Sequence, residues 1–309
     1  MPTSQSEKKF EQQFQQFITT PDTKHVFNVE GTDISYRRWE DPAEKTGITK
    51  PGLLFVHGYG AHSHWWDFIA PAFLDDYEVL AMDMSGAGDS QHRERYTATL
   101  FAREIISVCQ DAGLQSPVVI GHSFGGSMTR VAAHLHGESF SAVVLVDSHL
   151  PRHRGRRTPP PVPRAHIRHY DTLALGAKRF RLRPPQPCEN RFIVDYIAKH
   201  SLARDKDGYY FKLDQALFSK LQVDTGLELP DAARMVERSL CPVGFIYGAD
   251  SRLFPPAEVK TVTEVIKPGL YKCIPDAHHH VFLDQPLVFI NTLKEILKNL
   301  QLPRKPLVA

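Results

Sequence analysis

The chain has 309 residues, 42% of them hydrophobic, and a formal net charge of +2 at pH 7. Such a chain can bury a large core, and it is long enough for one α/β sheet with an inserted module. No stretch approaches the roughly 18 apolar residues of a membrane span, which excludes that class. The small net charge favours no class of partner, and the basic residues lack the framework of a nucleic-acid recognition module.

Residues Met1–Lys24 form a polar N-terminal extension without the apolar stretch of a secretory signal, so the expected location is cytoplasmic. One helical face of this extension carries Phe10, Phe14 and Phe17. Three interpretations stay open here: the face docks onto the core, pairs two copies into a homodimer, or lies on a lipid surface.

Predicted strands and helices alternate through residues 25–148, the first part of the core. A strand pair at residues 25–29 and 34–39 is joined through Gly31. Further strands are predicted at residues 53–56, 77–82, 118–120 and 142–146, with helices at 97–112 and 128–135. This alternation predicts an α/β fold: a mostly parallel sheet with helices on both faces, whose ligand site lies beyond the carboxyl ends of the strands.

A glycine-flanked serine separates one of these strands from the helix that follows it. Gly121 and Gly125 stand two residues to either side of Ser123. Glycine allows the backbone to fold sharply at such a strand-to-helix turn. A serine that only caps a helix would need neither glycine. Ser123 is therefore the predicted nucleophile.

An insertion is predicted at residues 149–238, because far more chain separates Asp147 from the strand near Pro242 than a crossover requires. We expect it to form a mainly helical cap with two short helices in residues 192–221. Its first part has a single acid, Asp171, and these arginines: Arg152, Arg154, Arg156, Arg157, Arg164, Arg168, Arg179, Arg181 and Arg183. They could attract an anionic substrate, an acidic partner or a phosphate surface, or form a solvated face.

The second part of the core, residues 239–309, supplies an acid and a base. The predicted strand at 242–247 is followed by Asp250, the predicted orienting acid, and Asp147 after the strand at 142–146 is the alternative. A later strand at 270–274 leads to His278, His279 and His280, one of which is the predicted general base. Consecutive side chains in an extended segment point to alternate faces and no HExxH pattern is present, so neither a metal nor another cofactor is predicted.

Four segments make residues 25–300 resemble serine-nucleophile enzymes of the α/β-hydrolase fold: residues 55–60, 83–90, 121–126 and the histidine segment that ends at residues 283–286. The order Ser, Asp, His is typical of that fold. In the family the base usually lies five residues before the acid of such an ending, which selects His279. This chain then has His278 at a position where the family usually has a glycine. It has Ser85 where the family commonly has an arginine with a structural role.

The chemistry of acyl transfer completes the predicted site. Backbone N–H groups of Phe124 and of Tyr59, which follows His57-Gly58, are predicted to hold the oxyanion. His122, Trp65 and Trp66 are the predicted substrate contacts, although such a tryptophan pair more often packs in a core.

We expect hydrolysis of a small or medium-sized carboxylic ester through an acyl-enzyme intermediate. Lactone, amide, thioester or carbon–carbon bond hydrolysis could use the same residues and remain alternatives, as does a slow-turnover, receptor-like binding protein on the same scaffold.

Overall fold

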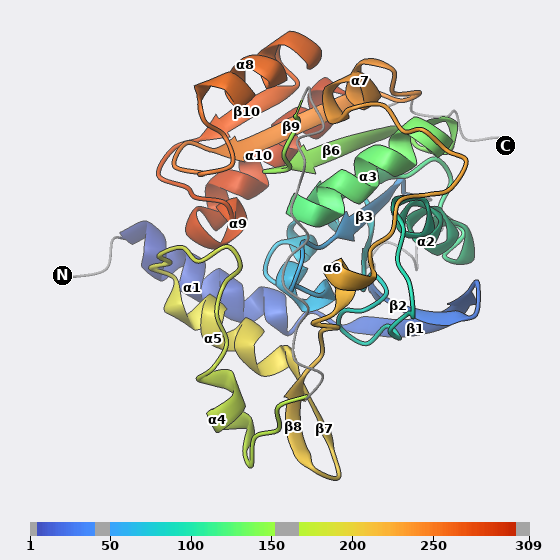
Figure 1. Ribbon diagram of the computed structural model, residues 1–309. Coiled ribbons are helices and arrows are strands. Elements are labelled where there is room, and N and C mark those ends of the chain that lie inside the picture. Colours follow the sequence, from blue (N-terminus) through green and yellow to red (C-terminus); the bar gives the residue numbers. More distant parts are fainter. Residues whose placement is uncertain (1–4, 41–49, 152–166, 301–309) are drawn as a thin grey trace, which may run out of the picture.

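The computed structural model describes residues 5–40, 50–151 and 167–300. Within them eight strands form one sheet in the order β1-β2-β4-β3-β5-β6-β9-β10 (Figure 1). The β1–β2 and β2–β4 pairs are antiparallel and the other neighbours are parallel, which confirms the predicted sheet. The strands are β1 (Asp22–Val29), β2 (Thr32–Trp39), β3 (Gly52–Val56), β4 (Glu78–Met82), β5 (Val118–His122), β6 (Ala142–Val146), β9 (Val243–Gly248) and β10 (Tyr271–Ile274).

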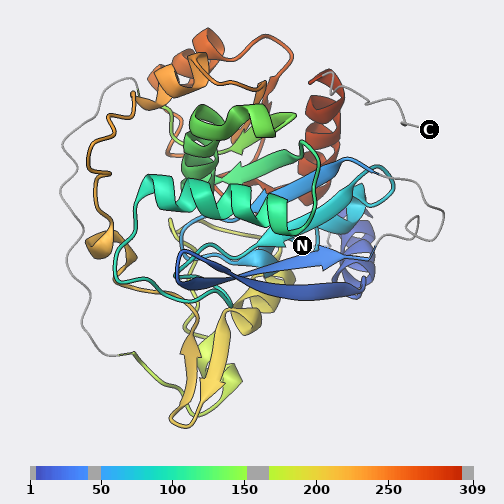
Figure 2. The ribbon, with the colours of Figure 1, turned by 90° about the vertical axis from the view of Figure 1, so that its right-hand side faces the viewer.

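Helices lie on both faces of this sheet (Figure 2). An apolar layer packs against each face. The central strands β3, β5 and β6 are buried along their whole length, as parallel strands covered on both sides must be. One layer contains α2 (Ala98–Asp111), α3 (Ser123–His136) and α8 (Pro256–Val265), and the other contains α1 (Gln5–Ile18) and α10 (Pro286–Asn299).

Shorter helical turns complete the core: η2 (Ser63–Trp66), η3 (Ala70–Phe73), η4 (Gly137–Ser139) and α9 (Val281–Asp284). Within the described ranges, every helix is too short or too polar to cross a membrane. All four cysteines are free thiols.

Helix α1 docks onto its own chain through its phenylalanine face. Phe10, Phe14 and Phe17 are all buried. The ring of Phe14 lies 4.9 Å from that of Phe192 in the insertion and 5.9 Å from that of Phe68, centroid to centroid. The core therefore occupies the face that could have contacted a second copy or a lipid surface.

The described part of the segment between β6 and β9 projects below the core in Figure 1 over residues 173–211 and returns to the side of α3 and α8 at residues 232–237. It contains α4 (Leu173–Ala177), α5 (Arg191–His200), β7 (Leu202–Asp205), β8 (Gly208–Phe211), α6 (Leu217–Lys220) and α7 (Ala232–Glu237). The two helices expected in residues 192–221 are α5 and α6, but a β-hairpin, β7–β8, separates them. Of the arginines that mark its first part, Arg152, Arg154, Arg156, Arg157 and Arg164 lie outside the described residues.

A buried polar cluster around Arg37 of β2 fastens the insertion to the sheet. The Arg37 guanidinium pairs with Asp67, which follows η2. Tyr196 of α5 donates a hydrogen bond to the same carboxylate at 2.6 Å. The ring of His200, at the end of α5, stacks on His64 with centroids 4.2 Å apart. Helix α5 is thus held by polar contacts as well as by apolar packing.

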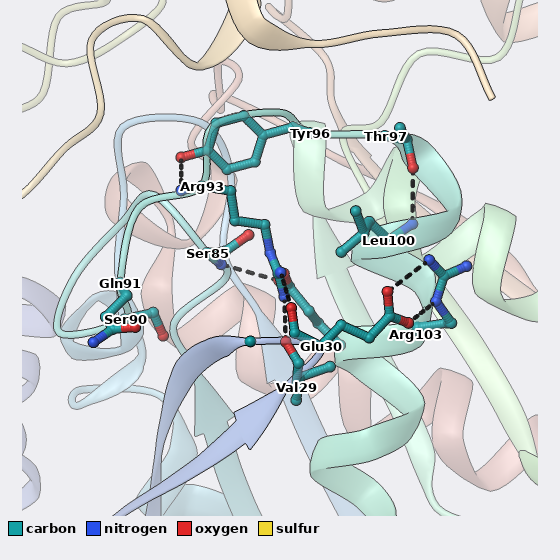
Figure 3. Close-up of polar contacts among 12 residues, drawn as sticks. Val29, Glu30, Ser85, Ser90, Gln91, Arg93, Tyr96, Thr97, Leu100 and Arg103 are labelled. Atoms are coloured by element: carbon teal, nitrogen blue, oxygen red, sulfur yellow. Dashed lines mark hydrogen bonds and ion pairs between the residues drawn. The ribbon is translucent and has the colours of Figure 1, made fainter. Parts of the chain in front are cut away.

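A second buried charge pair ties the edge of the sheet to α2. Arg93 Nε lies 2.9 Å from Glu104 Oε1, and the two side chains are 7% and 0% exposed. Glu104 also accepts the backbone N–H of Ser85, and Arg93 donates to the carbonyl oxygens of Val29 and Glu30 (Figure 3). Burial raises the pKa of Glu104, while Ser85 and Arg93 oppose the rise.

We predict that Arg93→Met destabilises the fold strongly, because it leaves Glu104 buried without its cation. The expected loss in free energy of unfolding is about 3–5 kcal/mol, measured by urea denaturation. Arg103→Met is the matched control, since Arg103 pairs with the exposed Glu30 (Figure 3) and such pairs contribute less than about 1 kcal/mol. Equal losses in the two variants would contradict a structural role for the buried pair.

We predict that His200 makes the fold less stable as the pH falls from about 6.5 to about 4. Burial, with nearby His64, lowers the pKa of His200 to about 4. Between that pH and the ordinary histidine pKa near 6.5, the unfolded chain binds more protons than the folded chain. Stability therefore falls as the pH falls through this window. His200→Gln should lose less stability than the wild type between pH 7 and pH 5 in urea titrations, and equal pH slopes would refute the assignment.

Candidate active site

Ser123 lies on a strained turn between β5 and α3. Its φ is +54°, in the left-handed region that is costly for residues other than glycine. A Cβ on Gly125 would lie 2.1 Å from the His57 carbonyl oxygen, and one on Gly126 would lie 2.6 Å from the Gly121 carbonyl oxygen. Only glycine permits such close backbone approaches. These glycines therefore allow the turn that presents Ser123.

A continuous chain of hydrogen bonds joins Ser123, His279 and Asp147. His279 Nε2 lies 2.8 Å from Ser123 Oγ, and Nδ1 lies 2.6 Å from Asp147 Oδ1. Because a carboxylate only accepts hydrogen bonds, Nδ1 carries a proton and Nε2 is left to accept the serine hydroxyl. The side chains of His279 and Asp147 are 4% and 0% exposed, whereas Ser123 is partly exposed. The structure thus brings together the predicted nucleophile and the predicted base.

Asp147 receives further hydrogen bonds from the end of β9. Its Oδ2 accepts the backbone N–H of Gly248 at 2.9 Å, and its Oδ1 accepts the hydroxyl of Ser251 at 2.7 Å. A fully buried carboxylate needs such donors because it has lost its hydration. Sequence reasoning missed Ser251, because a single serine in the loop after a strand carries no distinctive signal.

Asp250 was predicted to orient the histidine, and this prediction is wrong. Asp250 is exposed, and the hydrogen bond to His279 comes from Asp147 instead. The reason is the strand order: β6, which is followed directly by Asp147, lies between β5 and β9 and so places its carboxyl end beside Ser123. Asp147 has a left-handed φ of +43°, in the turn directly after β6.

The loop that carries His279 is fastened by the core and by the insertion. Asp284 accepts the backbone N–H of His278 at 2.7 Å. Gln186, from the segment before α5, donates to Asp284 at 2.9 Å and accepts the N–H of His280 at 2.8 Å. The insertion therefore contacts the histidine loop directly.

Three buried imidazoles, His122, His279 and His280, bring nitrogen atoms within 4.8 Å of one another. Burial lowers the pKa of both His122 and His280 well below the ordinary value, so these rings are neutral near pH 7. Both nitrogens of His279, however, are already hydrogen-bonded to Ser123 and Asp147. An ion held by all three rings would have to replace one of those bonds, so this donor set competes with the hydrogen-bond chain.

The loop after β3 also comes close to Ser123. A Cβ on Gly58 would lie 3.1 Å from Ser123 Cβ, so the next residue along the chain, Tyr59, begins close to Ser123. The buried ring of His57 holds this loop: Nδ1 donates to the Gly58 carbonyl oxygen at 2.8 Å, and Nε2 accepts a backbone N–H at 3.0 Å. Burial lowers the pKa of His57, which keeps the ring neutral for both bonds. Gly58, Tyr59 and Phe124 line a small cavity at this point.

The three predicted substrate contacts lie in the core. His122, Trp65 and Trp66 are 1%, 3% and 0% exposed. The ring of Trp66 packs 4.6 Å from that of Phe282, and His122 packs 5.0 Å from the same ring. Side chains with so little exposed surface offer almost nothing for a ligand to contact, so their assignment as substrate contacts is not supported. The tryptophan pair packs the core, as the alternative interpretation held.

Comparisons with known proteins agree with this architecture. A protein from Haemophilus influenzae named putative esterase/lipase is 24% identical over 263 residues, which cover 82% of this chain and 85% of that protein. The uncharacterized hydrolase YugF of Bacillus subtilis is 29% identical over 124 residues, 40% of this chain and 43% of that protein. The solved thioesterase domain from the curacin biosynthetic pathway superposes with a TM-score of 0.70 at 19% identity, covering 89% of this chain and 99% of that one.

The family model described as alpha/beta hydrolase fold matches residues 51–286. This range includes the turn at Ser123, the carboxylate of Asp147 and the loop of His279, and it spans most of the chain. The order and direction of the strands from β3 to β10 fit the same assignment. The chain therefore belongs to the alpha/beta hydrolase fold family.

Proposed function

We propose that this protein is a serine hydrolase that cleaves a small or medium-sized carboxylic ester through an acyl-enzyme intermediate. The observation that carries the proposal is the chain of hydrogen bonds from Ser123 through His279 to Asp147. A serine hydroxyl is a poor nucleophile near neutral pH unless an adjacent base can take its proton. His279 is that base, and Asp147 fixes its tautomer.

The proposed reaction begins when His279 Nε2 takes the proton of Ser123 as Oγ bonds to the ester carbonyl carbon. The carbonyl electron pair moves onto oxygen, which accepts hydrogen bonds from the backbone N–H groups of Phe124 and Tyr59. The intermediate collapses, the bond to the alcohol breaks, and His279 gives its proton to the leaving alkoxide. Water then attacks the acyl-enzyme with His279 again as base, which releases the acid and restores Ser123.

The insertion, residues 149–238, is proposed to act as a cap that shapes the substrate pocket. Its contact through Gln186 with the loop of His279 supports this role. The names of similar proteins favour acyl transfer to water: the Haemophilus influenzae protein is named a putative esterase/lipase and the curacin domain a thioesterase. Ester hydrolysis is the form of that chemistry that we propose.

Ser123→Ala should abolish turnover while leaving the fold intact. The expected loss in kcat for 4-nitrophenyl esters is at least about 10⁴-fold, because the nucleophile itself is removed. Intact-mass measurement after treatment with a fluorophosphonate should show one adduct on the wild type and none on the variant. Ser219→Ala, on the exposed surface of α6, is the matched control. It should keep both the ester turnover and the fluorophosphonate labelling of the wild type. Turnover near the wild-type level in a clean Ser123→Ala preparation would refute the assignment.

Asp147→Asn should cost much more activity than Asp250→Asn. Asparagine cannot stabilise the imidazolium that forms on His279 and favours the wrong tautomer, so kcat should fall by about 10³- to 10⁴-fold. Asp250→Asn changes an exposed side chain and should stay within about twofold of the wild type. Both variants would be compared by steady-state hydrolysis at pH 7.5, with circular dichroism as the test of folding. The reverse ranking would assign the role of orienting acid to Asp250, after the end of β9.

A further inference from the structure

A cavity of about 110 Å³ lies between the insertion and the loop after β3. Four cationic side chains line it: Arg179, Arg181 and Arg183 from the segment before α5, and Lys212 just after β8. Gly60 and His62 supply the wall on the side of the core. None of its lining residues, all within the described ranges, is an aspartate or glutamate.

The positive charge of this cavity is largely uncompensated. Within the described ranges, no carboxylate forms an ion pair with Arg179, Arg181 or Arg183, and Arg181 donates only to the backbone carbonyls of Lys178 and Phe180. Lys212 bonds to Asp89 at 2.8 Å, but Asp89 also bonds to Lys24, so two lysines share one carboxylate.

His62 adds no charge of its own to the cavity. Burial lowers the pKa of His62 well below the ordinary value, and the charge of Lys212 acts in the same direction. The ring is therefore neutral near pH 7, and the lining presents guanidinium and ammonium groups with no opposing charge inside the cavity.

The cavity adjoins the proposed catalytic site. Gly60 and Leu213 line both this cavity and the small cavity beside Phe124. Arg183 also lies against Tyr59: burial raises the pKa of the Tyr59 hydroxyl, and the neighbouring guanidinium opposes the rise.

The same loop limits how far the cavity lies from the nucleophile. A Cβ on Gly58 would lie 3.1 Å from Ser123 Cβ, and two residues span at most about 7 Å, so the Gly60 wall is within about 12 Å of the serine. A substrate of moderate length can therefore place one end at Ser123 and the other among the arginines.

We propose that this cavity binds an anionic group, a carboxylate or a phosphate, at the end of the substrate opposite the scissile ester. The guanidinium fork matches the oxygens of both anions in bidentate geometry. The inference rests on the proposed ester hydrolysis and specifies the substrate class of that site. The protein then prefers esters whose acyl chain ends in an anion.

The test compares 4-nitrophenyl esters of matched length. The carboxylate arm uses the 4-nitrophenyl hemiesters of adipic and suberic acid, each against its neutral methyl ester. The phosphate arm uses the 4-nitrophenyl ester of 6-phosphonooxyhexanoic acid against that of 6-methoxyhexanoic acid. In at least one arm, kcat/KM for the anionic ester should exceed that of its neutral partner by about tenfold or more. The arm with the larger ratio identifies the anion.

The double variant Arg179→Gln/Arg181→Gln should reduce this anionic-to-neutral ratio to near one. Arg191→Gln is the matched control, because Arg191 is an exposed arginine on α5 outside the cavity, paired at 4.0 Å with Asp195 one turn away. It should keep the wild-type ratio. High salt should lower the ratio in the wild type by screening the arginines.

The outcomes separate this inference from the proposed function. If the wild type hydrolyses anionic and neutral esters equally well in both arms, or if Arg191→Gln lowers the ratio as much as the double variant, the anion site is wrong and ester hydrolysis stands. If the wild type hydrolyses no ester and no fluorophosphonate labels Ser123, the proposed function itself fails.

Discussion

The buried carboxylate of Asp147 is the constraint on which the arrangement of the site depends. Moving a carboxylate out of water costs several kcal/mol unless donors replace its hydration. Here the donors are the Gly248 N–H, the Ser251 hydroxyl and His279 Nδ1. These groups come from the end of β9 and the loop after β10, so the carboxylate is satisfied only when both segments are in place beside β6. The position of His279, the proposed base, therefore depends on the packing of the sheet.

The proposed nucleophile is positioned in a different way, by the strained turn at Ser123. A left-handed serine persists only where its surroundings enforce it. Close contacts of Gly125 with the His57 carbonyl and of Gly126 with the Gly121 carbonyl provide that enforcement. The loop that contains His57 continues to Tyr59. The same backbone contacts therefore set both the exposure of Ser123 and the position of the proposed oxyanion donor.

The insertion is connected to this machinery through polar groups. Gln186 bridges Asp284 and the backbone of His280, and Tyr196 reaches the buried Asp67 that pairs with Arg37. Hydrogen bonds of this kind are directional, so they set the orientation of the insertion more narrowly than apolar contacts would. The arginines of the segment before α5 are consequently held beside the loop after β3, where they form the cationic cavity.

Local signals in the sequence were sufficient to predict the sheet and the turn at Ser123. Apolar runs indicate the parallel strands, and paired glycines indicate the turn. The resemblance to the family selects His279, which the structure places 2.8 Å from Ser123 Oγ. The acid could not be chosen in this way, because Asp147 and Asp250 both follow an apolar strand and only the order β5-β6-β9 decides which one reaches the histidine. Tertiary packing likewise placed Trp65 and Trp66 in the core and brought Arg179, Arg181 and Arg183 together with Lys212. Periodicity and spacing report a residue's immediate neighbours along the chain, whereas these features depend on which distant segments meet in space.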